Sequence, residues 1–300
     1  MARTVADTIR ELTSIHLEQQ GGLLFGQCIT AVGWIQNTVP PHARGLVELP
    51  MCDVSGPGFA IGAALMGRRS VFVLRFQSFL WLASSLLVNY CAKAKELWDN
   101  DVPLLIRAIG MEGHSIGPVS TNCFHSPYMH MPGLPVAAPM TPTECEQVWH
   151  WWMNQSGPLL VSEHRGSYSN TEELECELRA QPDITLFGIS ASRFHLEEAS
   201  QILARESIHC NIYHIVWLKP FKVDPLMEQM MKLSKLGLVI DSAYEMCGAA
   251  EHIAMQLMKE TGCRVEALGM EDRSCGIVDR NRNGTPTVER IVAKVKEMVA

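Results

Sequence analysis

The sequence lacks several features that would each place it in a particular class of protein. No apolar stretch reaches the roughly 18–20 residues that a membrane-spanning helix needs, and the N-terminus lacks the apolar core of a signal peptide. No run of basic residues occurs, and the formal net charge is −7, which argues against a nucleic-acid partner. We therefore expect a soluble, cytoplasmic protein that binds neither nucleic acid nor a membrane.

Two further absences concern metals and dinucleotides. The ten cysteines are scattered and never form a Cys-x-x-Cys pair, a spacing typical of zinc sites. Their scatter predicts reduced, mostly buried thiols and no metal site in this chain. No Gly-x-Gly-x-x-Gly turn follows an apolar run, which argues against a stand-alone dinucleotide-binding protein.

The sequence does contain a regular alternation of short apolar runs and helical patterns. Hydrophobic residues make up 47% and charged residues 19% of its 300 residues, as in a well-packed globular protein. The apolar runs of the first half are nearly continuous, as a parallel sheet buried on both faces requires. We expect strands within 22–30 and at 70–74, 102–109, 135–138 and 159–162, and helices at 58–66, 79–97 and 141–154.

A polar, acidic segment at 166–182 is poor in large apolar residues, and we interpret it as a linker. The alternation restarts beyond it. We therefore predict an α/β protein of two domains, 1–165 and 183–300, each a mainly parallel sheet flanked by helices. In the second domain we expect strands at 184–189, 210–216, 236–241 and 264–268, and helices at 196–206, 225–234, 248–261 and 287–299.

Several motifs carry more specific information than the fold class. From residue 48 the chain reads Glu-Leu-Pro-Met-Cys-Asp-Val-Ser-Gly-Pro-Gly-Phe-Ala, and from residue 71 it reads Val-Phe-Val-Leu-Arg-Phe-Gln-Ser-Phe. Met-Pro-Gly-Leu-Pro-Val follows at 131–136 and Leu-Lys-Pro-Phe at 218–221. In this order and spacing the chain resembles the beta subunits of the transketolase and 2-oxo-acid dehydrogenase superfamily. The resemblance extends over nearly the whole chain.

The resemblance implies a thiamine-diphosphate-binding fold followed by a transketolase C-terminal-like domain. In the family one domain holds the cofactor's diphosphate through Mg²⁺, and another holds its aminopyrimidine ring. This chain resembles the second kind and contains no Gly-Asp-Gly…Asn magnesium motif. The resemblance therefore implies a separate, diphosphate-binding alpha-type subunit that holds Mg²⁺, in an α2β2 heterotetramer with two-fold symmetry.

The family chemistry implies a beta-type subunit that is active only with its partner chain. Such an enzyme cleaves a small-molecule substrate, a 2-oxo acid or a ketose, and transfers an acyl, aldehyde or ketol unit to an acceptor. The acceptor is a lipoyl group, a carrier-protein thiol or a sugar aldehyde, and the cofactor supplies the carbanion chemistry. The alternative is a catalytically silent structural partner or scaffold that has lost cofactor activation.

The cofactor ring needs an aromatic contact and a carboxyl group. Phe76 and Phe79 match the family's aromatic positions. The alternative is that both are ordinary core residues. Counting back from residues 58–60 places Asp53 where the family has the Glu that hydrogen-bonds ring nitrogen N1′ and helps to activate the cofactor. Asp is one methylene shorter, so this hydrogen bond lengthens unless the backbone moves inward or a water bridges. Otherwise Asp53 is a solvated turn residue or a helix N-cap.

Four further residues are candidates through the same resemblance. Gln27 stands where the family often has an acid that links two active sites; a structural glutamine is the alternative. His114 and His125 flank the position of a family His-Ser-Gln-Ser run, and each is either a catalytic or substrate-binding group or a plain loop residue. Arg165 could bind an anionic substrate through paired hydrogen bonds or be an ordinary surface arginine. Transketolases place a phosphate-binding arginine at the position of Glu163.

Overall fold

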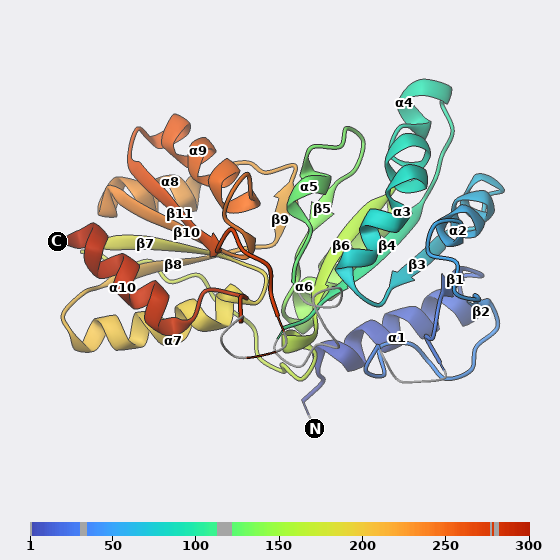
Figure 1. Cartoon of the computed structure of the whole chain (residues 1–300), viewed down its shortest axis with the longest axis horizontal. Helices are drawn as coiled ribbons and strands as arrows, with labels where there is room; N and C mark the ends of the chain where they lie inside the picture. The colour runs from blue at the N-terminus through green and yellow to red at the C-terminus, as the bar shows by residue number, and fades with distance from the viewer. Residues whose placement is uncertain (1, 31–34, 113–121, 277, 279–281) are drawn as a thin grey trace. The chain divides into compact units, whose positions relative to one another are not determined.

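The computed structural model describes every residue except 1, 31–34, 113–121, 277 and 279–281. The chain forms two compact units, Met1–Glu173 and Leu174–Ala300, whose elements are labelled in Figure 1. The boundary between the units falls inside 166–182, the segment predicted as a linker, whose own limits stay a prediction. Among the helices of the described ranges, none is long and apolar enough to cross a bilayer.

The first unit is built on a parallel sheet in which the strands follow the order β2-β1-β3-β4-β6-β5. Strands β3, β4 and β6 are buried along their whole length, as their continuous apolar sequences predict. Because all pairs are parallel, the carboxyl ends of the strands meet at one edge of the sheet. The strands are β1 (Leu23–Gly26), β2 (Leu46–Glu48), β3 (Ser70–Leu74), β4 (Leu104–Gly110), β5 (Val136–Ala137) and β6 (Leu159–His164).

Helices flank this sheet and begin at recognisable caps. At the start of α1, the Thr4 hydroxyl accepts from the Asp7 N–H and the Asp7 carboxylate accepts from the Thr4 N–H, which makes a capping box. At the start of α6 the Thr141 hydroxyl accepts from the Glu144 N–H. The helices are α1 (Val5–Glu18), α2 (Gly56–Leu65), α3 (Leu80–Leu86), α4 (Ala94–Trp98), α5 (Ser126–Met129) and α6 (Pro142–Met153).

The single long helix predicted at 79–97 is wrong. The chain forms a 3₁₀ turn η1 (Gln77–Phe79), then α3, a π-helical segment η2 (Leu87–Cys91), and α4. A π-helical turn holds about one residue more than an α-helical turn. Leu87 and Cys91 at the ends of η2 are both buried, so one face of this segment points to the core. Apolar periodicity alone did not distinguish these helical forms.

The second unit has a parallel sheet in the order β11-β10-β7-β8. One face is covered by α7 and α10, and the other by α8 and α9. The predicted fold class, two α/β domains with mainly parallel sheets flanked by helices, is confirmed. The elements are β7 (Ile184–Ile189), α7 (Ser192–Arg205), β8 (Cys210–Ile215), β9 (Trp217–Lys219), α8 (Pro225–Ser234), β10 (Leu236–Tyr244), α9 (Ala249–Thr261), β11 (Arg264–Met270) and α10 (Val288–Val299).

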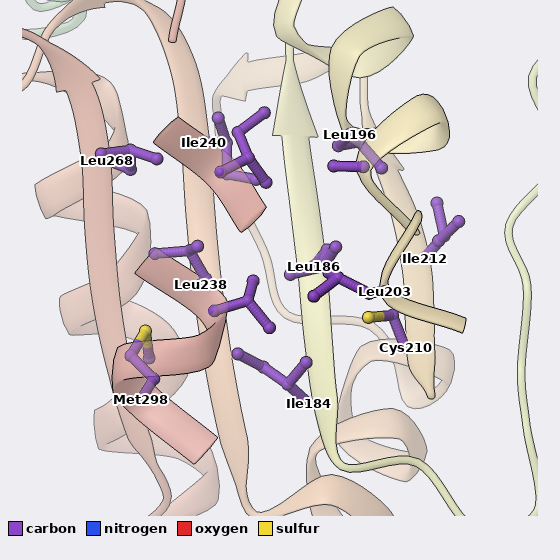
Figure 2. Close-up of a cluster of buried hydrophobic side chains, with 13 residues drawn as sticks. Ile184, Leu186, Leu196, Leu203, Cys210, Ile212, Leu238, Ile240, Leu268 and Met298 are labelled. Atoms are coloured by element: carbon purple, nitrogen blue, oxygen red, sulfur yellow. The ribbon is translucent and has the colours of Figure 1, made fainter. Parts of the chain in front are cut away.

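Figure 2 shows the core between this second sheet and its α7–α10 face. Ile184 and Leu186 from β7 and Leu238 and Ile240 from β10 are fully buried there. Alternate residues of each strand point to the same face, which explains why residues two apart share this core. The second unit therefore has its own hydrophobic core, as a separately packed domain requires.

Candidate functional site

The candidate residues of the first unit follow the carboxyl ends of neighbouring strands. Gln27 follows β1, Phe76 lies just beyond β3, and Arg165 follows β6. Strand β1 pairs with β3, β3 with β4, and β4 with β6. The sheet therefore brings these residues to a single edge, where ligands bind in open α/β sheets.

Phe76 and Phe79 form an edge-to-face pair with ring centroids 5.6 Å apart and an interplanar angle of 89°. Phe76 is 3% exposed, and Phe79 is partly buried. An arginine lies over each ring. The guanidinium carbon of Arg165 is 4.8 Å from the Phe76 centroid, and that of Arg75 is 5.3 Å from the Phe79 centroid. The aromatic pair thus makes two cation–π contacts at the sheet edge in addition to its core packing.

Asp53 lies, half-buried, in the turn that leads into α2. The N-cap of α2 is Ser55, and no side chain caps that helix end, so the alternative that Asp53 is the N-cap is wrong. Within the described residues the Asp53 carboxylate makes no hydrogen bond or ion pair. Met51, in the same turn, has its Sδ 3.7 Å from Nη2 of Arg75. That contact places the Asp53 turn beside the cation that covers Phe79.

Gln27 is 4% exposed, and neither its Oε1 nor its Nε2 has a hydrogen-bond partner in the part of the chain that the structure describes. A buried amide without hydrogen-bond partners destabilises the fold. The Gln27 amide therefore needs a polar group from outside the described residues. Next to it, the Glu48 carboxylate accepts from the Ile29 and Thr30 N–H groups and from the Thr30 hydroxyl. Glu48 therefore connects the loop after β1 to the end of β2 through hydrogen bonds. The motifs did not single out this residue.

His125 is fully buried, and its Nδ1 lies 2.9 Å from the Ser162 hydroxyl oxygen. Gln77 supports this contact, because its Nε2 donates to the same Ser162 oxygen at 2.8 Å and its Oε1 accepts from the Phe124 N–H at 2.7 Å. The network anchors His125 to β6 at the sheet edge. His114, the other predicted histidine, lies outside the described residues.

Arg165 has one main-chain and one thioether acceptor among the described residues. Its Nη2 donates to the main-chain oxygen of Arg75 at 3.1 Å, and its Nη1 lies 3.0 Å from Sδ of Met111. Its Nε is buried without a hydrogen-bond partner, and no carboxylate of the described ranges forms an ion pair with it. Burial lowers the pKa of the Arg165 guanidinium, and the charge of Arg75 acts in the same direction. Arg165 is half-buried at this position.

Motif matching missed Arg75, Gln77 and Ser162. Each is a polar residue near the carboxyl end of a fully buried strand, and that position was the signal that could have found them. Glu163, at the position of a transketolase phosphate-binding arginine, instead forms a buried ion pair with Arg107. In the described ranges no three His, Cys, Asp or Glu side chains converge as ligands of a metal ion.

Comparison with known proteins agrees with this arrangement. The transketolase pyrimidine-binding domain family matches residues 34–171, and the transketolase C-terminal domain family matches residues 176–279. The acetoin:2,6-dichlorophenolindophenol oxidoreductase subunit beta of Cupriavidus necator is 25% identical over 244 residues, 76% of this chain and 71% of that protein. The pyruvate dehydrogenase E1 component subunit beta of Porphyra purpurea is 24% identical over 225 residues, 71% of this chain and 68% of that protein.

A solved structure described as a split gene transketolase, inactive beta4 tetramer, shares the fold. It superposes with a TM-score of 0.76 at 15% identity, over 100% of this chain and 99% of that one. Together the two family matches span most of the sequence. The chain therefore belongs to the transketolase and 2-oxo-acid dehydrogenase superfamily, as a transketolase pyrimidine-binding domain followed by a transketolase C-terminal domain.

Proposed function

We propose that this chain is the pyrimidine-binding subunit of a two-chain, thiamine-diphosphate-dependent enzyme that cleaves a small 2-oxo acid or a ketose and passes the resulting unit to an acceptor. The observation that carries the proposal is that two groups suited to the cofactor's pyrimidine ring lie at the same edge of the sheet. The Phe76–Phe79 pair is one, and the Asp53 carboxylate, which has no partner among the described residues, is the other. When bound, thiamine diphosphate supplies the carbanion chemistry of such reactions.

The residues present fit the aminopyrimidine part of the cofactor. Phe79, the more exposed ring of the pair, would contact the pyrimidine face. Asp53 would hold the proton at ring nitrogen N1′. Gln27 offers a buried donor and acceptor that are unused within the described residues, which suits a ring edge that has both. His125 would keep the substrate side of the site ordered, because it is fixed through Ser162.

A partner chain is part of the proposal. Both named relatives are beta subunits, and the first unit exposes many large apolar side chains. Exposed apolar side chains concentrated on a few helices of a domain are typical of association surfaces, and these lie on α2, α3, η2 and α4 and in the turns beside α2. We assign this surface to a diphosphate-binding alpha-type subunit that would hold Mg²⁺, in an α2β2 assembly, with a lipoyl or acyl carrier domain as the candidate acceptor. The exposed apolar residues are Met51, Val54, Phe59, Leu65, Met66, Trp81, Leu82, Tyr90, Leu97 and Trp98.

Two features favour a second candidate function, a catalytically silent structural subunit. Arg165 covers a face of Phe76, and Asp53 is one methylene shorter than the glutamate of the family. If these two features prevent the cofactor from binding, the chain would assemble with its partner through the same apolar surface. It would then contribute stability to the assembly and no chemistry of its own.

Calorimetric titration of thiamine diphosphate with Mg²⁺ separates the two functions. We would titrate this chain alone and in complex with the alpha-type subunit that co-purifies with it. The enzyme proposal predicts binding to the complex only, and weaker binding when Asp53 is replaced by Ala. Asp101→Ala, an exposed aspartate of the same unit, is the matched control and should bind like the wild type. A folded complex that binds no cofactor would leave the silent subunit as the function.

A further inference from the structure

We propose that Gln77 and Ser162 are positioning residues that hold the His125 ring as the neutral tautomer with its proton on Nε2. The histidine then orders the candidate site as a hydrogen-bond donor and has no lone pair with which to act as a base. This role at the site rests on the proposed function, whereas the tautomer follows from the hydrogen-bond network alone. The three side chains are 1%, 1% and 0% exposed, respectively.

The orientation of the Gln77 amide is fixed by its surroundings. Its Oε1 accepts from the Phe124 N–H at 2.7 Å. On the other side, Nε2 lies 3.2 Å from the main-chain oxygen of Ala108 and 3.1 Å from that of Glu163. Exchanging the two ends of the amide would place oxygen against oxygen and N–H against N–H. The NH₂ group of Gln77 therefore faces β4 and β6.

The end of β4 leaves room for this amide. A Cβ atom built on Gly110 would lie 3.2 Å from Gln77 Nε2 and 2.9 Å from Cys123 Sγ, so a larger residue there would crowd both groups. Gln77 itself lies in the 3₁₀ turn η1, between Phe76 and Phe79 in the sequence. The amide that reaches Ser162 therefore also anchors the aromatic pair assigned to the pyrimidine ring.

The direction of the next hydrogen bonds follows from the orientation of the amide. Gln77 Nε2 can only donate, so the Ser162 hydroxyl oxygen accepts from it at 2.8 Å. The Ser162 hydroxyl proton then needs an acceptor of its own. Apart from Gln77, the one hydrogen-bond partner of this hydroxyl among the described residues is Nδ1 of His125, at 2.9 Å. Ser162 therefore donates to Nδ1, which carries no proton.

The opposite direction would leave a buried proton unsatisfied. If Nδ1–H donated to Ser162, the serine proton would have no acceptor in the part of the chain that the structure describes. A buried polar hydrogen without an acceptor destabilises a fold. A protonated His125 ring would have the same effect, because both of its nitrogens would carry a proton.

The tautomer decides what His125 can do chemically. A neutral imidazole accepts through one nitrogen and donates through the other. In His125 the accepting nitrogen is already used by Ser162, so no lone pair is left to remove a proton from a substrate. Of the two roles that histidine takes at neutral pH, base or donor, the network allows the second. Because the ring is fully buried, this donor orders the groups around it, and His125 is a positioning residue.

NMR of the full chain labelled with ¹⁵N-histidine tests the tautomer without cofactor or partner. Ring nitrogens with and without a proton give separate signals, and NOEs to the β protons of residue 162 identify His125 among the eleven histidines. At neutral pH we expect a proton on Nε2 and none on Nδ1. Ser162→Ala removes the donor to Nδ1, so it should lower the ratio of the Nε2–H to the Nδ1–H form roughly tenfold, as the loss of one hydrogen bond would produce.

Two controls show whether the change is specific to the serine hydroxyl. Ser162→Thr keeps the hydroxyl and should retain the wild-type ratio. His16, another fully buried histidine of the first unit, lies outside the network, and its signals should be the same in the wild type and in both variants.

Three results would overturn the proposal: a proton on Nδ1 in the wild type, a protonated ring at neutral pH, or an unchanged ratio in Ser162→Ala. If Ser162→Ala does not fold, Gln77→Met frees the serine oxygen to accept from Nδ1 and should also lower the ratio; an unchanged ratio in that variant would be equally contrary. Calorimetry of thiamine diphosphate is a separate measurement, so the tautomer and the proposed function can each fail alone.

Discussion

Arg107 and Glu163 form an ion pair inside the first unit, with 2.5 Å between Arg107 Nε and Glu163 Oε1. Their side chains are 1% and 4% exposed. The second carboxylate oxygen accepts from Arg107 Nη2 at 2.9 Å and from the Tyr168 hydroxyl at 2.7 Å. Glu163 therefore has a structural role in this chain.

Removing one charge of the Arg107–Glu163 pair is expected to lower the stability of the first unit strongly. Glu163→Gln leaves the Arg107 cation buried without its anion, so we expect a loss of about 3–5 kcal/mol in the free energy of unfolding. Urea denaturation followed by tryptophan fluorescence measures this loss in unfolding free energy, because all tryptophans except Trp217 lie in the first unit. Glu228→Gln breaks an exposed pair with Lys232 and should cost less than about 1 kcal/mol. Equal losses in the two variants would contradict the structural role.

Gln77 is predicted to organise the segment that carries His125. Its side chain joins the Ser162 hydroxyl to the Phe124 N–H, and it is 1% exposed. Gln77→Met keeps the length of the side chain but removes both of these hydrogen bonds, so we expect a loss of about 2–3 kcal/mol in unfolding free energy. Hydrogen exchange of the Phe124 amide should accelerate. Gln201→Met, at an exposed position of α7, should change neither quantity. An unchanged Phe124 exchange rate would contradict this role.

The sequence predicted those parts of the fold that depend on local pattern. Strand β3 and helix α8 lie at the expected residues, since a continuous apolar run and an amphipathic helix with Pro225 in its first turn are local signals. Strand β2 was missed because its three residues are partly or fully exposed and carry no such pattern. Helix α1 was not identified either, although Thr4 and Asp7 form its capping box.

Residues of the candidate site could be predicted only where they match a position of a family motif. Asp53, Phe76 and Phe79 came from the family pattern, and the structure brings the aromatic pair and the Asp53 turn to the same edge. The contacts of Arg165 with Phe76 and of Gln77 with Ser162 join residues about ninety positions apart. Such contacts follow from the order of the strands in the sheet, and the residue types alone did not indicate that order.

His16 is expected to make stability depend on pH. The ring is 0% exposed and lies edge-on to Trp149 and Trp152, with centroid distances of 5.8 and 5.5 Å, and burial lowers its pKa. A lowered histidine pKa means that the unfolded chain binds the proton first, so the stability contribution is present above about pH 6.5 and is lost as the pH falls below it.

His16→Phe removes this titration while keeping an aromatic ring. Between pH 7.5 and pH 5 we expect the wild type to lose up to about 2 kcal/mol more unfolding free energy than the variant. Urea denaturation at the two pH values gives the difference. His150→Phe, at an exposed histidine of α6, should retain the wild-type pH dependence. A wild-type pH dependence in His16→Phe would show that other groups cause the loss.

Asp53 gives the sharpest test of cofactor activation. The half-buried carboxylate has no partner in the described residues, and a glutamate at this position would extend it by one methylene toward the pyrimidine. If the short side chain limits the hydrogen bond to N1′, Asp53→Glu should bind thiamine diphosphate about tenfold more tightly in the complex with the alpha-type subunit, as one improved charge-assisted bond would produce. Asp53→Asn keeps the shape and loses the charge, so it should bind more weakly. Weaker binding by both variants would mean that Asp53 already has the length this backbone requires, because the added methylene would then cause a steric conflict.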